Sequence, residues 1–132
     1  MATIFSKIIA GEIPAHKVAE NDDYLAFLDI MPVVWGHTLV IPKKEVDYYF
    51  DLENDTLAGL NVFAKRVAKA LEKVVPCLRI GVAVAGLEVP HAHVHLIPMN
   101  TISDINFGQD RQRADDELLS DLAQKIRVHV ER

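Results

Sequence analysis

The feature that most restricts the fold is a long stretch, residues 54–75, in which apolar side chains recur at steps of three and four. This spacing places six of them along one side of an α-helix, and they are Leu57, Leu60, Ala64, Val67, Leu71 and Val74. Charged residues occupy much of the remaining surface, so the helix must bury its apolar side against another layer. Pro76 ends it, and Asp51 or Asn54 is expected to cap its start.

Segments with the pattern of β-strands lie on both sides of this helix. Three precede it, at residues 16–21, 24–30 and 37–42, and two follow it, at residues 77–86 and 88–99. Turn-forming residues and prolines separate most of them. Strands joined by short turns and interrupted by one long helix predict an α+β domain with a mostly antiparallel sheet.

Two shorter helices complete the prediction. One covers residues 3–10, and the other runs from about residue 113 to 131 with acidic residues in its first turn and basic residues late, as the helix dipole favours. The apolar residues on one side of the second helix are Leu119, Leu122, Ile126 and Val130. No repeat or linker divides the 132 residues, so we expect a single domain over 1–132, with a core at 3–99 and a C-terminal extension at 100–132.

Composition narrows the class of protein. The formal net charge of −5 argues against a protein that holds nucleic acid by its phosphate backbone, but it leaves room for one small anion. No apolar run reaches the length of a membrane span, and Lys7 interrupts the N-terminal apolar stretch. A cytoplasmic location without membrane contact is therefore expected. The single cysteine, Cys77, provides neither an internal disulfide nor a cysteine-based zinc site.

Three of the six histidines stand at every second position in "VPHAHVHLIP": His91, His93 and His95. Since side chains alternate across a strand, the three imidazoles are expected on one face. The apolar side chains between them are expected on the core face, and they are Ala92, Val94 and Leu96. A polar strand face more often carries Thr, Lys or Glu, so three imidazoles together indicate a chemical role.

Three interpretations of these histidines are open on spacing alone. A shared metal ion would need a sharply bent strand, because the rise of about 3.3 Å per residue separates His91 from His95 by roughly 13 Å. A catalytic role fits the spacing better: one neutral imidazole attacks phosphorus, and its neighbours stabilise the phosphate oxygens. The third interpretation is a hydrogen-bonded or solvated strand face without chemistry.

The "HAHVHLIP" segment fits the His-x-His-x-His-apolar pattern of the histidine-triad superfamily of nucleotide hydrolases and transferases. The N-terminal segment "TIFSKIIAGEIPAHKVAENDDYLAFLDIMPVVWGHTLVIPKK" also resembles its nucleotide-binding branch, so the resemblance covers residues 3–99. It implies a five-stranded antiparallel sheet with one long helix and a homodimer whose sheets join across the interface.

The resemblance also implies roles for individual residues. His93 would attack the α-phosphorus of a nucleoside 5′-phosphate derivative and carry the nucleotide covalently, while His91 and His95 would bracket the phosphate and leaving group. His37 would be the family's additional histidine near the site, and Asp29 would accept both ribose hydroxyls. The apolar walls of the base pocket would be Ile13, Phe27, Ile30 and Leu39.

The residues themselves support part of this assignment. A carboxylate two positions from an aromatic residue, as in Phe27 and Asp29, would suit a ribose and its base. The alternatives are a turn role for Asp29 and plain core packing for Phe27. His16 and His129 have no supporting pattern and are interpreted as surface residues.

Departures from the family pattern are also informative. Thr3 and Ser6 stand where some members have zinc-binding cysteines, so neither a metal nor another cofactor is expected. The loop before the triad usually supplies polar groups to the phosphate, but the matching positions here are Ile80, Leu87 and Glu88. A glutamate repels a phosphate unless it is protonated or turned away, so Glu88 is assigned to the nucleotide site as a contact for a cationic leaving group, such as an amine or a lysine side chain.

The triad and the resemblance together imply an enzyme that hydrolyses purine nucleoside 5′-phosphoramidates or aminoacyl-adenylates and releases AMP. Two alternatives are a dinucleoside polyphosphate hydrolase and a nucleotide-binding sensor or scaffold with little catalysis. The expected partners are a purine nucleotide and a second copy of the chain.

Overall fold

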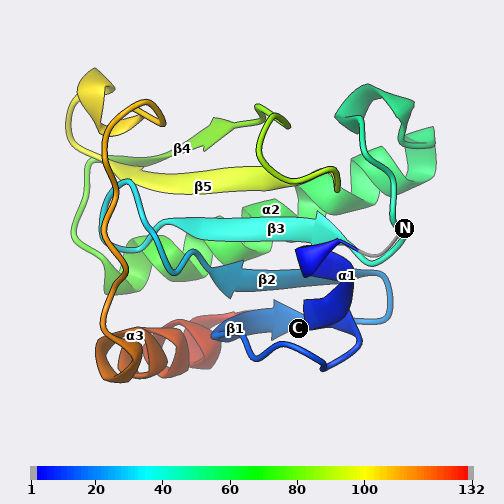
Figure 1. Cartoon of the computed structure of the whole chain (residues 1–132). Coiled ribbons are helices and arrows are strands. Elements are labelled where there is room, and N and C mark those ends of the chain that lie inside the picture. The colour runs from blue at the N-terminus through cyan, green and yellow to red at the C-terminus, as the bar shows by residue number, and fades with distance from the viewer. Residues whose placement is uncertain (1–2, 131–132) are drawn as a thin grey trace.

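The structure, a computed structural model, describes residues 3–130. Five antiparallel strands form one sheet in the order β1-β2-β3-β5-β4. The strands are β1 (Lys17–Glu20), β2 (Tyr24–Leu28), β3 (Thr38–Pro42), β4 (Arg79–Ala83) and β5 (Val94–Met99). The helices are α1 (Ile4–Ile9), α2 (Asn54–Val74) and α3 (Asp116–His129), with short 3₁₀ turns η1 (Tyr49–Asp51) and η2 (Ile102–Asp104). The predicted five-stranded α+β architecture is thus confirmed (Figure 1).

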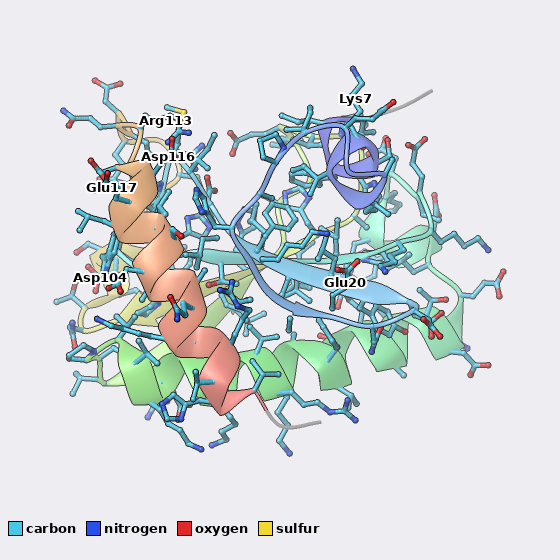
Figure 2. All side chains as sticks on the ribbon, turned by 90° about the horizontal axis from the view of Figure 1, so that it is seen from below. Lys7, Glu20, Asp104, Arg113, Asp116 and Glu117 are labelled. Carbon is cyan, nitrogen blue, oxygen red and sulfur yellow. The ribbon has the colours of Figure 1, made fainter. Side chains whose placement is uncertain are left out.

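The two faces of the sheet carry different layers. Helix α2 packs its apolar stripe across the strands, and Leu60, Val67 and Leu71 are fully buried there. Helix α3 packs against α2 and the edge strand β1 with Leu119, Leu122 and Ile126 buried; Figure 2 shows it crossing α2, with Arg113, Asp116 and Glu117 at its start. A second apolar cluster lies on the other face, beneath α1, and its buried members are Phe5, Ile8, Leu25, Phe27, Leu39 and Ile41.

Alternation along the histidine segment is confirmed, although the segment is less regular than predicted. Ala92, Val94 and Leu96 lie in the core cluster on the α2 side. However, β5 begins only at Val94, so the strand expected over 88–99 is wrong at its N-terminal end. Pro90 cannot donate to a strand ladder, and the amide of Ala92 bonds to Val46 in the loop after β3.

Several other ends differ from the predicted ones. Strand β2 ends at Leu28, so Asp29 lies just beyond it, and β4 covers only the middle of the segment expected at 77–86. Glu53 is the N-cap residue of α2, but its side chain accepts no hydrogen bond from the first turn of the helix. The expectation that Asp51 or Asn54 would cap it is wrong, because Asp51 belongs to η1 and Asn54 is already the first helical residue. The last residue of the predicted C-terminal helix, 131, lies outside the described residues.

Among residues 3–130, no helix combines the length and the apolar composition that a membrane span requires. The longest, α2, has 21 residues, but it is amphipathic and its apolar side packs on the sheet.

Gly36 makes the turn that leads into β3 and to His37. Its φ is +94°, and a Cβ atom there would lie 3.0 Å from both Pro98 Cγ and Val75 Cγ2. The turn also holds the backbone of Asp29, whose amide donates to the carbonyl of His37 over 2.9 Å. Backbone conformation and close packing therefore both favour glycine at this position.

Gly36→Ala should lower the free energy of unfolding by about 2–4 kcal/mol, since a positive φ costs an L-residue roughly 1–2 kcal/mol and the new methyl group overpacks the core. Urea denaturation measures the change. Gly11→Ala is the matched control, because Gly11 also has a positive φ, +81°, but an added Cβ would meet nothing within 4 Å. Equal losses in the two variants would show that the contacts with Pro98 and Val75 do not restrict this site.

Candidate active site

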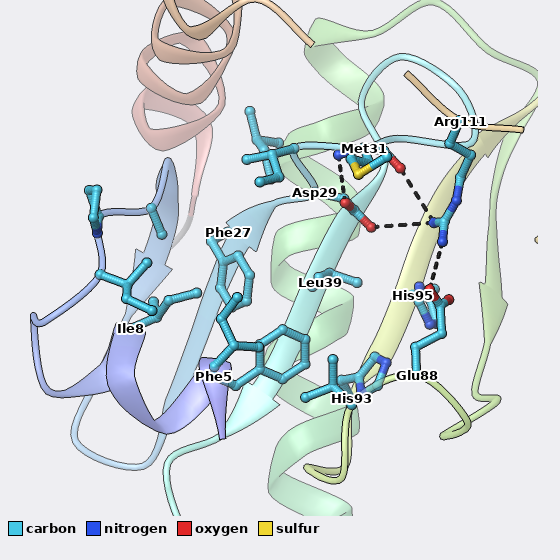
Figure 3. A pocket seen from close by; sticks show the side chains of 17 residues that line it. Phe5, Ile8, Phe27, Asp29, Met31, Leu39, Glu88, His93, His95 and Arg111 are labelled. Carbon is cyan, nitrogen blue, oxygen red and sulfur yellow. Dashed lines mark hydrogen bonds and ion pairs between the residues drawn. The ribbon is translucent and has the colours of Figure 1, made fainter. Parts of the chain in front are cut away.

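A cavity of about 290 Å³ opens on the sheet face that carries α1. Its walls are mostly apolar, and its polar residues are Asp29, Glu88, His93, His95 and Arg111. Figure 3 shows the polar side chains on one side of the cavity and Ile8 and Phe27 on the other. An apolar cavity with a few convergent polar groups is the usual form of a small-molecule site.

The apolar wall contains all four residues proposed for it from the sequence, which are Ile13, Phe27, Ile30 and Leu39. Phe27 and Leu39 are register partners on β2 and β3, so their side chains stand next to each other on one face. Phe5 and Ile8 from α1 complete the wall. The sequence analysis did not assign them to a site, although their spacing of three residues places both on one side of α1.

His93 is held with one ring nitrogen engaged. Its Nδ1 lies 2.6 Å from the backbone carbonyl of His91, and a carbonyl can only accept, so Nδ1 carries the proton. The Nε2 lone pair of the neutral ring then remains available. The Phe5 ring meets His93 edge-to-face at 5.0 Å, and burial is the main cause that lowers the pKa of His93. The side chain is therefore a neutral, oriented base at the cavity wall.

A second imidazole, His95, is oriented through His37. The amide of Val33 donates to His37 Nδ1 over 3.1 Å, so neutral His37 carries its proton on Nε2. That nitrogen lies 2.8 Å from His95 Nδ1 and donates to it. His95 in turn carries its proton on Nε2, which makes no hydrogen bond within the described residues. This chain of donors leaves an N–H available to a ligand in the cavity that His95 lines.

Burial keeps both of these rings uncharged. It is the largest cause that lowers the pKa of His37 to about 3 and that of His95 to about 4. For His95, the nearby His93 and Arg111 lower the pKa further. The two rings are therefore neutral at neutral pH. This agrees with the hydrogen bond between them, in which His37 Nε2 carries the proton and His95 Nδ1 accepts it.

His91 does not line the cavity. Its side chain is fully buried, its Nε2 donates to the carbonyl of Pro42 over 2.8 Å, and its Nδ1 accepts from the Thr3 hydroxyl over 3.3 Å. Both ring nitrogens therefore have protein partners. His91 joins the end of β3 to the cap of α1 and presents its carbonyl to His93, which suits a positioning role better than contact with a phosphate.

Asp29 combines the two interpretations that the sequence left open. Its Oδ1 accepts from the amide of Met31 over 2.8 Å, which is the pattern of an Asx turn. Its Oδ2 lies 3.8 Å from Arg111 Nη1 and 3.6 Å from His37 Nδ1. Burial raises the pKa of this carboxyl. Asp29 is thus a turn residue whose carboxylate also lines the cavity.

The three unusual positions before the triad have separate environments. Ile80 packs at the edge of the core, and Leu87 is almost fully exposed. Glu88 lines the cavity, but its carboxylate already has a cationic partner, because Arg111 donates to it over 2.7 Å. Of the three, Glu88 lines the cavity that holds Asp29, whereas Leu87 borders a second hollow that also includes His93.

Two functional candidates come from the C-terminal extension, which the sequence analysis left without a role. The Phe107 ring packs on His95 with centroids 4.6 Å apart, and Arg111 reaches the polar side of the cavity. No local pattern signals either residue, since both are brought to the site by the path of the chain. The two remaining histidines lie elsewhere: His16 bonds to Asp116, and His129 is exposed at the end of α3.

In the part of the chain that the structure describes, no three His, Cys, Asp or Glu side chains are grouped so that they could hold a metal ion.

The buried histidines predict a pH-dependent stability. Because the pKa values of His37 and His95 are lowered in the folded protein, the unfolded chain binds more protons below the ordinary histidine pKa. The free energy of unfolding should therefore fall as pH drops from about 6.5 towards 4, by about 1.4 kcal/mol per pH unit for each such histidine. In His37→Asn, urea denaturation at several pH values should show that the free energy of unfolding falls less steeply with decreasing pH. The difference should be the contribution of one histidine. A slope equal to that of the wild-type protein would contradict the assignment.

Comparisons with known proteins identify relatives over most of the chain. The chain is 38% identical over 125 residues to an uncharacterized HIT-like protein from Methanocaldococcus jannaschii, covering 90% of this chain and 97% of that one. It is 36% identical over 132 residues to adenosine 5′-monophosphoramidase HNT1 from Saccharomyces cerevisiae, covering 98% and 84%.

The fold has solved relatives as well. The crystal structure of a Hit-like protein involved in cell-cycle regulation from Bartonella henselae superimposes with a TM-score of 0.85 at 36% identity, covering 96% of this chain and 95% of that one. A model of the HIT domain matches residues 10–102, most of the chain and all three histidines of the triad. The chain therefore belongs to the histidine-triad (HIT) family.

Proposed function

We propose that this protein hydrolyses purine nucleoside 5′-phosphoramidates or aminoacyl-adenylates and releases AMP. The observation that carries the proposal is the orientation of His93, whose Nδ1–H is held by the His91 carbonyl so that Nε2 is free at a cavity that also contains Asp29. The similarity to a yeast adenosine 5′-monophosphoramidase supports the same reaction class.

In the proposed reaction, His93 Nε2 attacks the α-phosphorus and the bond to the leaving amine or carboxylate breaks. A departing amine takes up a proton from the solvent. Water then attacks the nucleotidyl-histidine and the P–N bond breaks, which releases AMP, gives a proton to the solvent and restores the neutral imidazole. The Nε2–H of His95 donates to a phosphoryl oxygen as charge develops on it, and His37 holds His95 in the tautomer that makes this possible. His91 acts as a positioning residue for His93.

The rest of the cavity suits a nucleoside. Asp29 provides carboxylate oxygens that accept from the two ribose hydroxyls, and hydrogen bonds to an ionised acceptor are stronger than those between neutral groups. The base then lies against the apolar wall formed by Phe27, Leu39 and the α1 side chains, where an aromatic ring favours stacking or edge contacts.

The central test is His93→Ala on a fluorogenic AMP-amine substrate. Loss of the nucleophile should lower kcat by about a thousandfold or more, while AMP binding measured by calorimetry persists. His129→Ala is the matched control, because His129 is exposed on α3 and its loss should leave kcat unchanged. Unchanged turnover in His93→Ala would contradict the assignment of His93 as the nucleophile.

The same assay separates the alternatives. Faster turnover of diadenosine polyphosphates than of phosphoramidates would favour a dinucleoside polyphosphate hydrolase, and AMP binding without turnover on either would favour a sensor.

A 2′,3′-dideoxy substrate tests the role of Asp29. Asp29→Asn should raise KM for the ribose substrate but not for its dideoxy analogue.

We also infer that two copies associate through β4. Within residues 3–130, this strand pairs only with β5, whereas the opposite edge strand, β1, contacts α3. Val82 on β4 is 62% exposed and lies near Tyr48 and Phe50, which are exposed as well. An apolar surface beside an unpaired strand edge favours association.

Val82→Arg should therefore convert a dimer into a monomer in sedimentation equilibrium, because it introduces like charges at a two-fold interface. Val128→Arg is the control, since Val128 is 77% exposed on α3, away from this edge. A wild-type protein that stays monomeric at tens of micromolar would refute the inference.

A further inference from the structure

The segment between η2 and α3, residues 105–115, passes along one end of the sheet from the β4 side to the β1 side (Figure 1). It is anchored where it meets the site. Ala114 donates its amide to Ile30 over 2.8 Å, Gln109 donates its side-chain amide to Val33 over 3.2 Å, and Phe107 packs on His95. These contacts fix the path of the segment beside the polar part of the cavity.

Arg111 is the residue of this segment that enters the cavity (Figure 3). Its Nη2 donates to Glu88 Oε2 over 2.7 Å, and its Nη1 donates to the carbonyl of Met31 over 3.3 Å and lies 3.8 Å from Asp29 Oδ2. Only 14% of the side chain is exposed. A guanidinium has five N–H donors in a rigid plane, so donors remain for a ligand after these contacts.

The charges around the cavity require such a cation. Among residues 3–130, Arg111 is the only Lys or Arg that lines it, and two carboxylates, Asp29 and Glu88, face the same space. The imidazoles of His93 and His95 supply oriented hydrogen-bonding groups but no permanent positive charge. Without Arg111, a phosphate would therefore approach two negative groups and no cation.

The position of Arg111 also fits the path of a nucleotide. A ribose held at Asp29 and a phosphorus at His93 Nε2 would place the 5′-oxygen and the phosphoryl group beside the guanidinium, because Arg111 lies between the Asp29 and Glu88 carboxylates (Figure 3). An anion in this place can accept from the donors that Arg111 does not use for protein contacts.

We propose that Arg111 binds the phosphoryl oxygens of the nucleoside 5′-phosphate and replaces the polar groups missing from the loop before the triad. Glu88 holds the guanidinium in place and competes with the phosphate for it. The inference rests on the proposed function, but it concerns a residue outside the HIT-domain match at residues 10–102. The C-terminal extension then contributes a specificity-determining side chain to the site.

The experiment compares binding of AMP and adenosine to the full chain by calorimetry, because the two ligands differ only in the phosphate. Arg111→Gln should weaken AMP binding about ten- to a hundredfold, the usual effect of losing hydrogen bonds to a charged group, and should leave adenosine affinity unchanged. Arg111→Lys keeps the charge but lacks the planar set of donors of a guanidinium, so it should lose less AMP affinity than Arg111→Gln. Arg113→Gln is the matched control, since Arg113 pairs with Asp116 outside the cavity (Figure 2).

Glu88→Gln provides an independent variant that keeps Arg111. It removes a negative charge and a competing acceptor, so AMP should bind several-fold more tightly while adenosine affinity stays constant. This variant decides the question if Arg111→Gln fails to fold, as thermal unfolding would reveal.

Each contrary result has a distinct meaning. Equal losses for AMP and adenosine in Arg111→Gln would assign Arg111 to holding the segment in place, and tighter AMP binding would make it an inhibitory plug; both outcomes overturn the proposal. Unchanged AMP binding in Glu88→Gln would do the same. A wild-type protein that binds adenosine but gains nothing from the phosphate overturns this proposal alone, whereas one that binds neither ligand overturns the proposed function with it.

Discussion

The hydrogen bond from His93 Nδ1 to the backbone carbonyl of His91 is the interaction on which the proposed chemistry of the site depends. It selects the tautomer of His93 and turns Nε2 outward, and it does so with an acceptor that cannot rotate or take up a proton. The carbonyl is itself well placed, because the His91 ring joins Pro42 at the end of β3 to Thr3 at the cap of α1. Sheet, helix and triad are therefore connected through one buried imidazole.

Burial shapes the site in a second way. The histidines are held neutral by their removal from water, which suits a nucleophile and a chain of oriented donors but leaves an anionic ligand without a counter-charge. A nearby carboxylate, Glu88, increases that need. The polar side of the cavity is thus balanced by a residue from the C-terminal extension, whose path is set by contacts with the loop between β2 and β3.

Much of the fold follows from periodicity. The apolar stripe of α2 and the alternation through Ala92, Val94 and Leu96 predict which side chains enter the core, because both depend only on the geometry of the helix and the extended chain. The ends of the elements do not follow in this way. The amide of Ala92 donates to the loop after β3, and Asp51 forms part of a 3₁₀ turn. Where such an element ends therefore depends on backbone groups that are distant in the sequence.

For the site, the sequence by itself determined the triad, its apolar partners, the cavity residues Phe27, Asp29 and Leu39, and the resemblance to the HIT family, because these lie in continuous segments with local patterns. Only the tertiary structure decided that His91 faces protein partners while His93 and His95 line the cavity. It alone brought Arg111 to Glu88. The physical reason is that ring orientation and long-range ion pairs depend on which groups the folded chain places within hydrogen-bonding distance, and no spacing along the sequence encodes that.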